Sequence, residues 1–336
     1  MMETAEHSLA ASQTGGKLAG VVAAALVVLV LVPVQLVTRP PMLLAERFFP
    51  GAGWGEILGL ALYAAWLCRT MVSGSHTGLW RQRLWRLFSL VFFTQLLLGL
   101  MGIDRCLMSG NLHLPVPALI IAGPIYRCGG LFMPVLLAIT ILLAGPIWCS
   151  YLCYIGAWDD IAARHRVAAT PLPRWRNLAR LAVLLLVVGT AYLLRELAAP
   201  ISLVIALPAS FGLAGVAIMA TLSRRTGAMV HCAAFCPIGW LTTTLGRLNP
   251  FRIRIQSDCL QCGLCYPVCR YDALSKEHVI SGKAGPNCTL CGDCIDSCPR
   301  TQIHYTFPGL SPTRARTAFL VLAVVLHTLF LALGRL

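Results

Sequence analysis

The chain has 336 residues, of which 57% are hydrophobic and 12% charged, and its mean hydropathy is +0.75. This composition excludes an ordinary soluble protein and is typical of a membrane protein. The net charge of +14 comes from arginines concentrated in a few connections, with no basic stripe that interleaves aromatic residues, so it gives no support to nucleic-acid binding.

Seven apolar runs follow a polar amino-terminal segment, residues 1–17, and each is long enough to cross a bilayer core of about 30 Å. We interpret the first as an uncleaved span, because it is longer than the apolar region of a signal peptide and no small-residue cleavage site follows it. A proline-rich apolar segment, 114–126, is too short to cross and is predicted to be re-entrant or interfacial. The predicted spans are 18–37, 55–72, 84–103, 131–148, 178–197, 201–222 and 317–333.

Arginines alternate between rich and poor connections along the chain. They gather between the second and third spans, between the fourth and fifth, and after the sixth, whereas the other connections are nearly neutral. Because cytoplasmic loops carry an excess of Lys and Arg, we expect the basic connections and the amino terminus on the cytoplasmic side of the inner membrane. Seven spans then place the carboxyl terminus in the periplasm.

Two similar cysteine pairs stand at the predicted cytoplasmic ends of spans. Each is a C-x3-C pair followed by a ring residue, Ile and Gly, which indicates an internal repeat. If the two halves pack together, four thiols converge, the ligand count of an iron–sulfur cluster. Apolar packing of free cysteines and redox-active dithiol chemistry are the alternatives. The pairs are Cys149 with Cys153 and Cys232 with Cys236.

Eight further cysteines lie between residues 259 and 299 in two runs of C-x2-C-x2-C-x3-C, the second followed by Pro299. This is the spacing of bacterial two-cluster ferredoxins, in which the fourth Cys of one run binds the cluster of the other. Structural zinc is the alternative, but it does not call for two interlocked runs of four. The predicted [4Fe–4S] ligands are Cys259, Cys262, Cys265 and Cys298 for one cluster, and Cys288, Cys291, Cys294 and Cys269 for the other.

The C-x3-C pairs followed by two ferredoxin runs resemble the NapH and NosR group of membrane polyferredoxins. Segments 47–54, 112–117 and 123–127 are similar to the membrane portion of NosR-type proteins in particular. The resemblance implies quinol-linked electron transfer to a redox partner, with clusters on the cytoplasmic face.

Two departures from the family pattern weaken parts of this resemblance. Tyr154 replaces the proline after the first C-x3-C pair, and Arg270 replaces the proline after the first ferredoxin run. NosR-type proteins also carry an amino-terminal flavin domain, and nothing in this sequence is long enough to be one. We therefore expect a flavin, if one is used, on a separate subunit.

Four polar residues near the predicted outer side would suit a quinone head group, which needs a hydrogen-bond donor and a proton acceptor. Ordinary interfacial anchoring is the alternative. On the same side, a disulfide between Cys106 and Cys128 is permitted but not established. The quinone candidates are Asp104, Arg105, His113 and Arg127.

The sequence thus predicts an all-α polytopic membrane protein with an inserted two-cluster ferredoxin-like module. The expected divisions are 1–17, a membrane domain over 18–248, the module over 249–308 and a last span within 309–336. The expected function is electron relay between the quinone pool or a cytoplasmic donor and respiratory flavin or haem subunits. A factor that reduces copper during oxidase assembly and a cluster-based sensor are the alternatives.

Overall fold

The computed structural model describes residues 2–74, 76–107 and 114–333. The chain forms two compact units. The bundle unit combines Met1–Gly110 with Gly309–Leu336, and the thiol unit is Asn111–Pro308. All the cysteines of the predicted cluster sites belong to the thiol unit.

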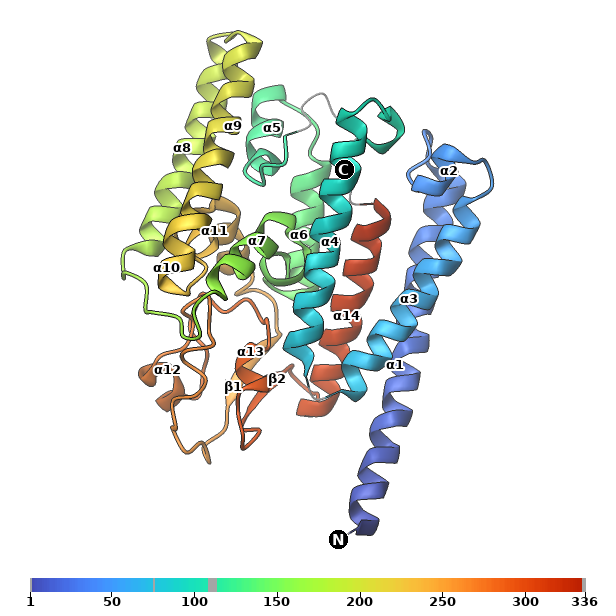
Figure 1. Ribbon diagram of the computed structural model, residues 1–336, viewed down its shortest axis with the longest axis vertical. Helices are drawn as coiled ribbons and strands as arrows, with labels where there is room; N and C mark the ends of the chain where they lie inside the picture. Colours follow the sequence, from blue (N-terminus) through green and yellow to red (C-terminus); the bar gives the residue numbers. More distant parts are fainter. Residues whose placement is uncertain (1, 75, 108–113, 334–336) are drawn as a thin grey trace. The chain divides into compact units, whose positions relative to one another are not determined.

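The bundle unit is built from long apolar helices that pack along one another (Figure 1). A Cβ at Gly20 would lie 2.7 Å from the carbonyl oxygen of Ala65, so this glycine permits the close approach of the first two long helices. The last helix is buried along most of its length, and its His327 Nε2 lies 3.1 Å from the hydroxyl of Tyr63. The elements are α1 (Met2–Val37), α2 (Leu44–Phe48), α3 (Gly53–Ser73), α4 (Thr77–Leu100), η1 (Asp104–Cys106) and α14 (Pro312–Leu333).

The thiol unit joins two long helices, several short ones and a small two-stranded sheet (Figure 1). Three of its turns are π-helical, and two of these carry cysteines. Its elements are α5 (Leu119–Arg127), α6 (Phe132–Ala144), η2 (Trp148–Leu152), α7 (Tyr154–Ala163), α8 (Arg176–Glu196), α9 (Ile201–Ile218), η3 (Met219–Ser223), α10 (Arg224–Thr226), η4 (His231–Phe235), α11 (Pro237–Leu245), β1 (Arg252–Ile255), α12 (Lys276–Ile280), α13 (Asp293–Asp296) and β2 (Ile303–Thr306).

Six helices in the described chain are long and apolar enough to cross a membrane, which confirms the predicted fold class. They cover Thr14–Val37, Gly53–Ser73, Thr77–Leu100, Arg176–Glu196, Ile201–Thr226 and Pro312–Leu333.

The predicted span over 131–148 is the exception. Its helix, α6, has 13 residues, and at about 1.5 Å per residue it is shorter than a bilayer core. Gly145, with φ of 74°, and Pro146 end the helix while the sequence stays apolar, so the structure has six helices of spanning length where the sequence predicts seven spans. The predicted non-spanning segment contains α5, which has 9 residues.

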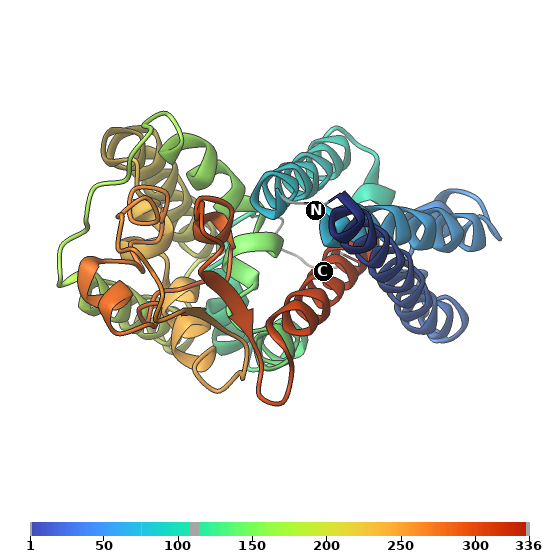
Figure 2. The ribbon, with the colours of Figure 1, turned by 90° about the horizontal axis from the view of Figure 1, so that it is seen from below.

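Strands β1 and β2 bring together the two ends of the ferredoxin-like module. They pair antiparallel, with Arg252 opposite Thr306 and Ile255 opposite Ile303 (Figure 2). Ile253 and Tyr305, also paired, are buried. The cysteine runs therefore lie in a closed segment of chain between two hydrogen-bonded strands.

Candidate functional site

The structure gathers the four thiols of the first predicted set, called here set 1. Burial, together with the charges of Cys259, Cys262 and Cys298, raises the pKa of Cys265 to about 11. Cys298 thus reaches this set from the second run, as the ferredoxin spacing predicts. Cys262 is exposed, so set 1 lies near the protein surface.

Set 2 consists of Cys288, Cys291, Cys294 and Cys269, whose side chains all line one small cavity. Burial raises the pKa of Cys294 well above its usual value, and the charges of the other three thiols add to the rise. Cys269 is the member contributed by the first run. The crossing of one cysteine from each run into the other set is therefore present in the fold.

The two runs share one backbone conformation, which explains why their cysteines are placed alike. Gln261 and Leu290, which precede the second cysteine of each run, both have positive φ, of 51° and 58°. Gly263 and Gly292, which follow those cysteines, have φ of 79° and 83°. Left-handed residues tighten the loop around a centre and turn backbone N–H groups toward it.

The fourth cysteine of each run, which joins the set of the other run, accepts a hydrogen bond from a backbone N–H in both runs. The Ala273 N–H lies 3.2 Å from Cys269 Sγ, and the Gln302 N–H lies 3.3 Å from Cys298 Sγ. Hydrogen bonds to sulfur stabilise thiolates and raise the reduction potential of an attached cluster. The module therefore provides two matched thiol environments.

The C-x3-C pairs form a third group of four thiols, called here set 3. Cys149 lies in π-helical turn η2 and Cys232 at the corresponding position of η4. Burial raises the pKa of Cys232 well above its usual value, and the charge of Asp159 and then those of Cys236, Cys153 and Cys149 add to the rise. The two halves of the repeat thus bring their thiols together, and π-helical turns are frequent at functional sites.

The second cysteine of each pair begins a helix. Cys153 precedes α7 and Cys236 precedes α11, both with extended backbone. N–H groups two and three residues further on bond to each sulfur and lower its pKa, although burial raises it more. The amino terminus of a helix favours negative charge, so both positions suit a thiolate bound to metal.

Two polar residues from distant elements hold the other cysteines of set 3. The hydroxyl of Thr242 on α11 lies 3.0 Å from Cys149 Sγ. Asp159 on α7 is fully buried, and its Oδ2 accepts a hydrogen bond of 2.9 Å from the Cys232 N–H. Burial raises the pKa of Asp159 to about 6. Each half of the repeat therefore fixes a cysteine of the other half.

Arg180 provides a test of whether set 3 suits an anionic cluster. Its side chain is 2% exposed and donates to the amide oxygens of Asn177 and Asn287, at 2.6 and 2.7 Å. Within the described residues it has no carboxylate partner. A buried cation without a counter-charge is strongly destabilising.

Arg180 also acts on the thiols of set 3. Burial raises the pKa of Cys149 to about 12, and the Thr242 hydroxyl and the Arg180 guanidinium act in the opposite direction. Four thiolates around a [4Fe–4S] core carry a net negative charge, which would compensate this guanidinium. The residues around set 3 therefore fit such a group.

A single zinc ion is the alternative to a cluster at these thiols. Among the residues that the structure describes, no three His, Cys, Asp or Glu side chains are placed to hold one metal ion. Zinc would require ligand atoms about 2.0–2.3 Å from a common point. The iron and zinc contents of the purified protein therefore distinguish the two alternatives.

Hydrogen bonds connect set 3 to set 2. The Tyr271 hydroxyl, two residues after Cys269, donates to the carbonyl oxygen of Cys149. The Ser150 hydroxyl donates to the carbonyl oxygen of Thr289, next to Cys288, at 2.8 Å. The loops of the two sets are therefore in direct contact.

The proposed quinone residues do not form one described site. Asp104 and Arg105 belong to the bundle unit, Arg127 belongs to the thiol unit, and His113 lies outside the described residues. Arg105 lies over the ring of Phe48, with 5.7 Å between guanidinium carbon and ring centroid. The head-group site suggested by the sequence stays a prediction.

Cys106 and Cys128 are both free thiols, the first buried and the second exposed. They belong to different units. The disulfide that the sequence permits between them stays a prediction.

Sequence reasoning missed three side chains around set 3: Arg180, Asp159 and Thr242. An arginine inside a membrane-spanning run is a signal in itself, but Arg180 also continues the basic connection before its span and so resembles an arginine that sets membrane orientation. Asp159 and Thr242 act across the repeat, and no local spacing indicates such a contact. Only the fold brings them to the cysteines.

A family described as a 4Fe-4S binding domain matches residues 128–173 and 205–256. Each matched segment contains one C-x3-C pair of set 3, and neither extends into the ferredoxin runs. No curated protein and no solved structure matches the chain. The chain is a multi-pass membrane protein with a 4Fe-4S binding domain, and this combination implies electron transfer in general.

Proposed function

From membrane-spanning helices joined to a 4Fe-4S binding domain, we infer that this protein is a membrane-bound electron relay with three [4Fe–4S] centres. Sets 1, 2 and 3 are the ligands of these centres. The relay connects the membrane quinone pool or a cytoplasmic donor to a respiratory redox partner, with any flavin or haem carried by that partner. Such a cluster supplies one-electron chemistry at a potential set by hydrogen bonds, charge and exposure.

One observation carries the proposal: twelve cysteines of one unit fall into three groups of four. The groups combine residues from different segments, and each mixes cysteines of two similar motifs. Thiols that served only in packing would not be expected to gather in this number and pattern. Iron–sulfur ligation accounts for all twelve.

The surroundings of the sets support an order along the relay. Three of the four cysteines of set 3 are buried, set 2 contacts set 3 through Tyr271 and Ser150, and set 1 includes the exposed Cys262. Exposed Leu260 and Leu264 flank Cys262. We therefore place exchange with a soluble or peripheral partner at set 1 and exchange with a membrane donor at set 3.

The alternation of arginines along the sequence supports a cytoplasmic position for the thiol sets. A cytoplasmic module requires one more crossing between α4 and α7 than the six long helices supply, and we assign it to α6 together with the apolar turn that follows, because α6 alone is too short to cross. The proposed sidedness is tested by labelling single exposed cysteines from either side of sealed vesicles. Modification of Cys262 from the periplasmic side alone would overturn it.

Iron and acid-labile sulfide analysis of the anaerobically purified full chain, joined to an EPR-monitored redox titration, tests the proposal. We expect about four iron atoms per set and three separable one-electron signals. Protein that contains zinc instead of iron, or no metal after anaerobic purification and reconstitution, would contradict it.

A further inference from the structure

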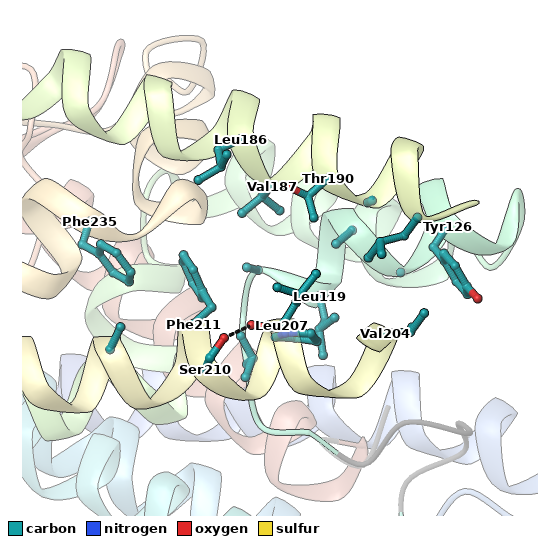
Figure 3. A pocket seen from close by; sticks show the side chains of 18 residues that line it. Leu119, Tyr126, Leu186, Val187, Thr190, Val204, Leu207, Ser210, Phe211 and Phe235 are labelled. Atoms are coloured by element: carbon teal, nitrogen blue, oxygen red, sulfur yellow. Dashed lines mark hydrogen bonds between the residues drawn. The ribbon is translucent and has the colours of Figure 1, made fainter. Parts of the chain in front are cut away.

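A cavity of about 400 Å³ lies in the thiol unit among α5, α8 and α9 (Figure 3). No charged side chain is among the described residues that line it, and most of these residues are aliphatic or aromatic. The volume lies within the range of about 300–1,000 Å³ typical of small-molecule sites. Since α8 and α9 belong to membrane-spanning segments, a ligand would enter from the lipid phase.

One end of the cavity is formed by an aromatic pair. The rings of Phe211 and Phe235 are stacked, with centroids 4.6 Å apart and an interplanar angle of 19° (Figure 3). Phe235 belongs to turn η4 and directly precedes Cys236 of set 3. The cavity wall and the ligands of set 3 are therefore parts of the same turn.

Thr190 supplies a polar group on the wall made by α8 (Figure 3). In the other long helices, Thr70, Thr221 and Thr328 donate their hydroxyls to the carbonyl oxygen four residues earlier. The Thr190 hydroxyl makes no such bond and has no other partner in the described chain, whereas the Ser210 hydroxyl donates to Leu207. Thr190 is thus available to a ligand.

These features specify the chemistry of the ligand. A phosphate or carboxylate head would find no cation on the wall, so a phospholipid or fatty-acid head group is a poor fit. A flat neutral ring fits beside the stacked phenylalanines, and a ring carbonyl matches the Thr190 donor. An aliphatic tail suits the apolar remainder of the cavity.

We propose that this cavity binds a lipid-soluble quinone, with its ring toward Phe211 and Phe235, hydrogen-bonded by Thr190, and its tail between α8 and α9. The inference rests on the proposed relay function and names the site of its membrane substrate. It differs from the sequence-based quinone site, because Asp104, Arg105 and Arg127 do not line the cavity. A ring bound here would lie against the turn that carries Cys232 and Cys236.

Equilibrium binding of a decyl-tailed naphthoquinone to the full chain in lipid nanodiscs tests the site. Ala191 lines the cavity, and Ala182 lies about two and a half turns away on the exposed, opposite face of α8. We expect Ala191→Phe to raise Kd at least about tenfold by filling the cavity, and Ala182→Phe to leave it unchanged. Thr190→Val should raise Kd about two- to tenfold through loss of one hydrogen bond.

Photo-crosslinking of the unaltered protein with an azido-quinone avoids any dependence on how the variants fold. Labelling of peptides from α8 or α9 near Thr190 and Phe211 supports the proposal. Labelling confined to other segments, or displacement of the probe by phospholipid alone, overturns it.

The same binding assay on iron-free protein separates this inference from the relay function. Saturable binding that is lost in Ala191→Phe, in a protein that never holds iron, would retain the cavity assignment and reject the relay. Iron-loaded protein with three titrating centres but no saturable quinone binding would reject the cavity assignment alone.

Discussion

Set 1 and set 3 use the same four-thiol chemistry in opposite surroundings. Set 1 is held by tight loops of a small module, beside the exposed Leu260 and Leu264, and its Cys262 is exposed. Set 3 is held by π-helical turns and helix starts, and its Cys149 and Cys232 are each 7% exposed. If the sets hold the clusters that we propose, their location, more than their ligands, distinguishes their electron-transfer partners.

Charge separates the two sets as well. A buried guanidinium, Arg180, lies beside set 3, whereas Cys298 of set 1 receives a neutral backbone N–H from Gln302. A nearby positive charge stabilises the more negative, reduced state of a cluster. We therefore expect a single side chain to contribute more to the reduction potential of a cluster in set 3 than to that of a cluster in set 1.

The largest expected effect is a loss of iron when two cysteines of set 3 are replaced. The double substitution Cys149→Ser with Cys232→Ser should lower the iron content from about twelve to about eight atoms per chain, because one of three clusters is lost. Colorimetric iron analysis measures this. Cys68→Ser, which removes a buried thiol of α3 outside the sets, is the control. Unchanged iron in the double variant would show that set 3 holds no cluster.

The next largest difference is expected in the rate at which oxygen destroys the cluster of the exposed set 1 and that of the buried set 3. In air, the EPR signal that is lost in a Cys262→Ser variant should decay at least about tenfold faster than the signal lost in the set 3 double variant, because water and oxygen reach it more easily. Time courses on the unaltered protein provide the measurement. Equal decay of both signals would remove the distinction between a surface and a buried centre.

Arg180→Gln should shift the potential of set 3 with little effect on set 1. Loss of the positive charge disfavours the reduced state, so the midpoint should fall by roughly 60–120 mV, a ten- to hundredfold change in the one-electron equilibrium. A redox titration followed by EPR gives the value. Arg174→Gln, at an exposed position before α8, should leave the potential unaltered. A rise in the midpoint would contradict the assigned role.

Tyr271→Phe should produce the smallest change. It removes the hydrogen bond to the Cys149 carbonyl and keeps all twelve thiols, so iron content should stay constant. Electron transfer between sets 2 and 3 should slow by at most about tenfold, the size of one hydrogen bond. Flash photoreduction resolves this step, with Tyr266→Phe beside set 1 as the control. A slower rate in the control alone would reject the proposed contact.

The sequence is most informative where the residues of a site lie close together in the chain. The spacing from Cys259 to Cys298 predicts which thiols share a set, and the fold gathers those thiols; their ligation of iron stays a prediction. The span count failed at Gly145, where a helix ends inside an apolar run and composition does not change. Helix ends depend on backbone geometry, which hydropathy does not report.

The cavity illustrates a second limit. Its lining, such as Ala191 and Leu207, is made of the residues that also face lipid, so hydropathy does not distinguish a ligand site from a membrane surface. Asp159 and Thr242 meet the cysteines only because the repeat folds back on itself. Contacts between distant segments are decided by packing, and the sequence alone does not reveal them.

The buried Arg180 has a consequence for how the protein is made in the cell. On the proposed loading of set 3 with a cluster, the guanidinium lies buried beside neutral thiols before iron and sulfide bind, and we expect the empty chain to be less stable than the loaded one. Iron-starved cells should therefore clear the protein by proteolysis instead of accumulating an empty form. Maturation and survival of the polypeptide become a single event.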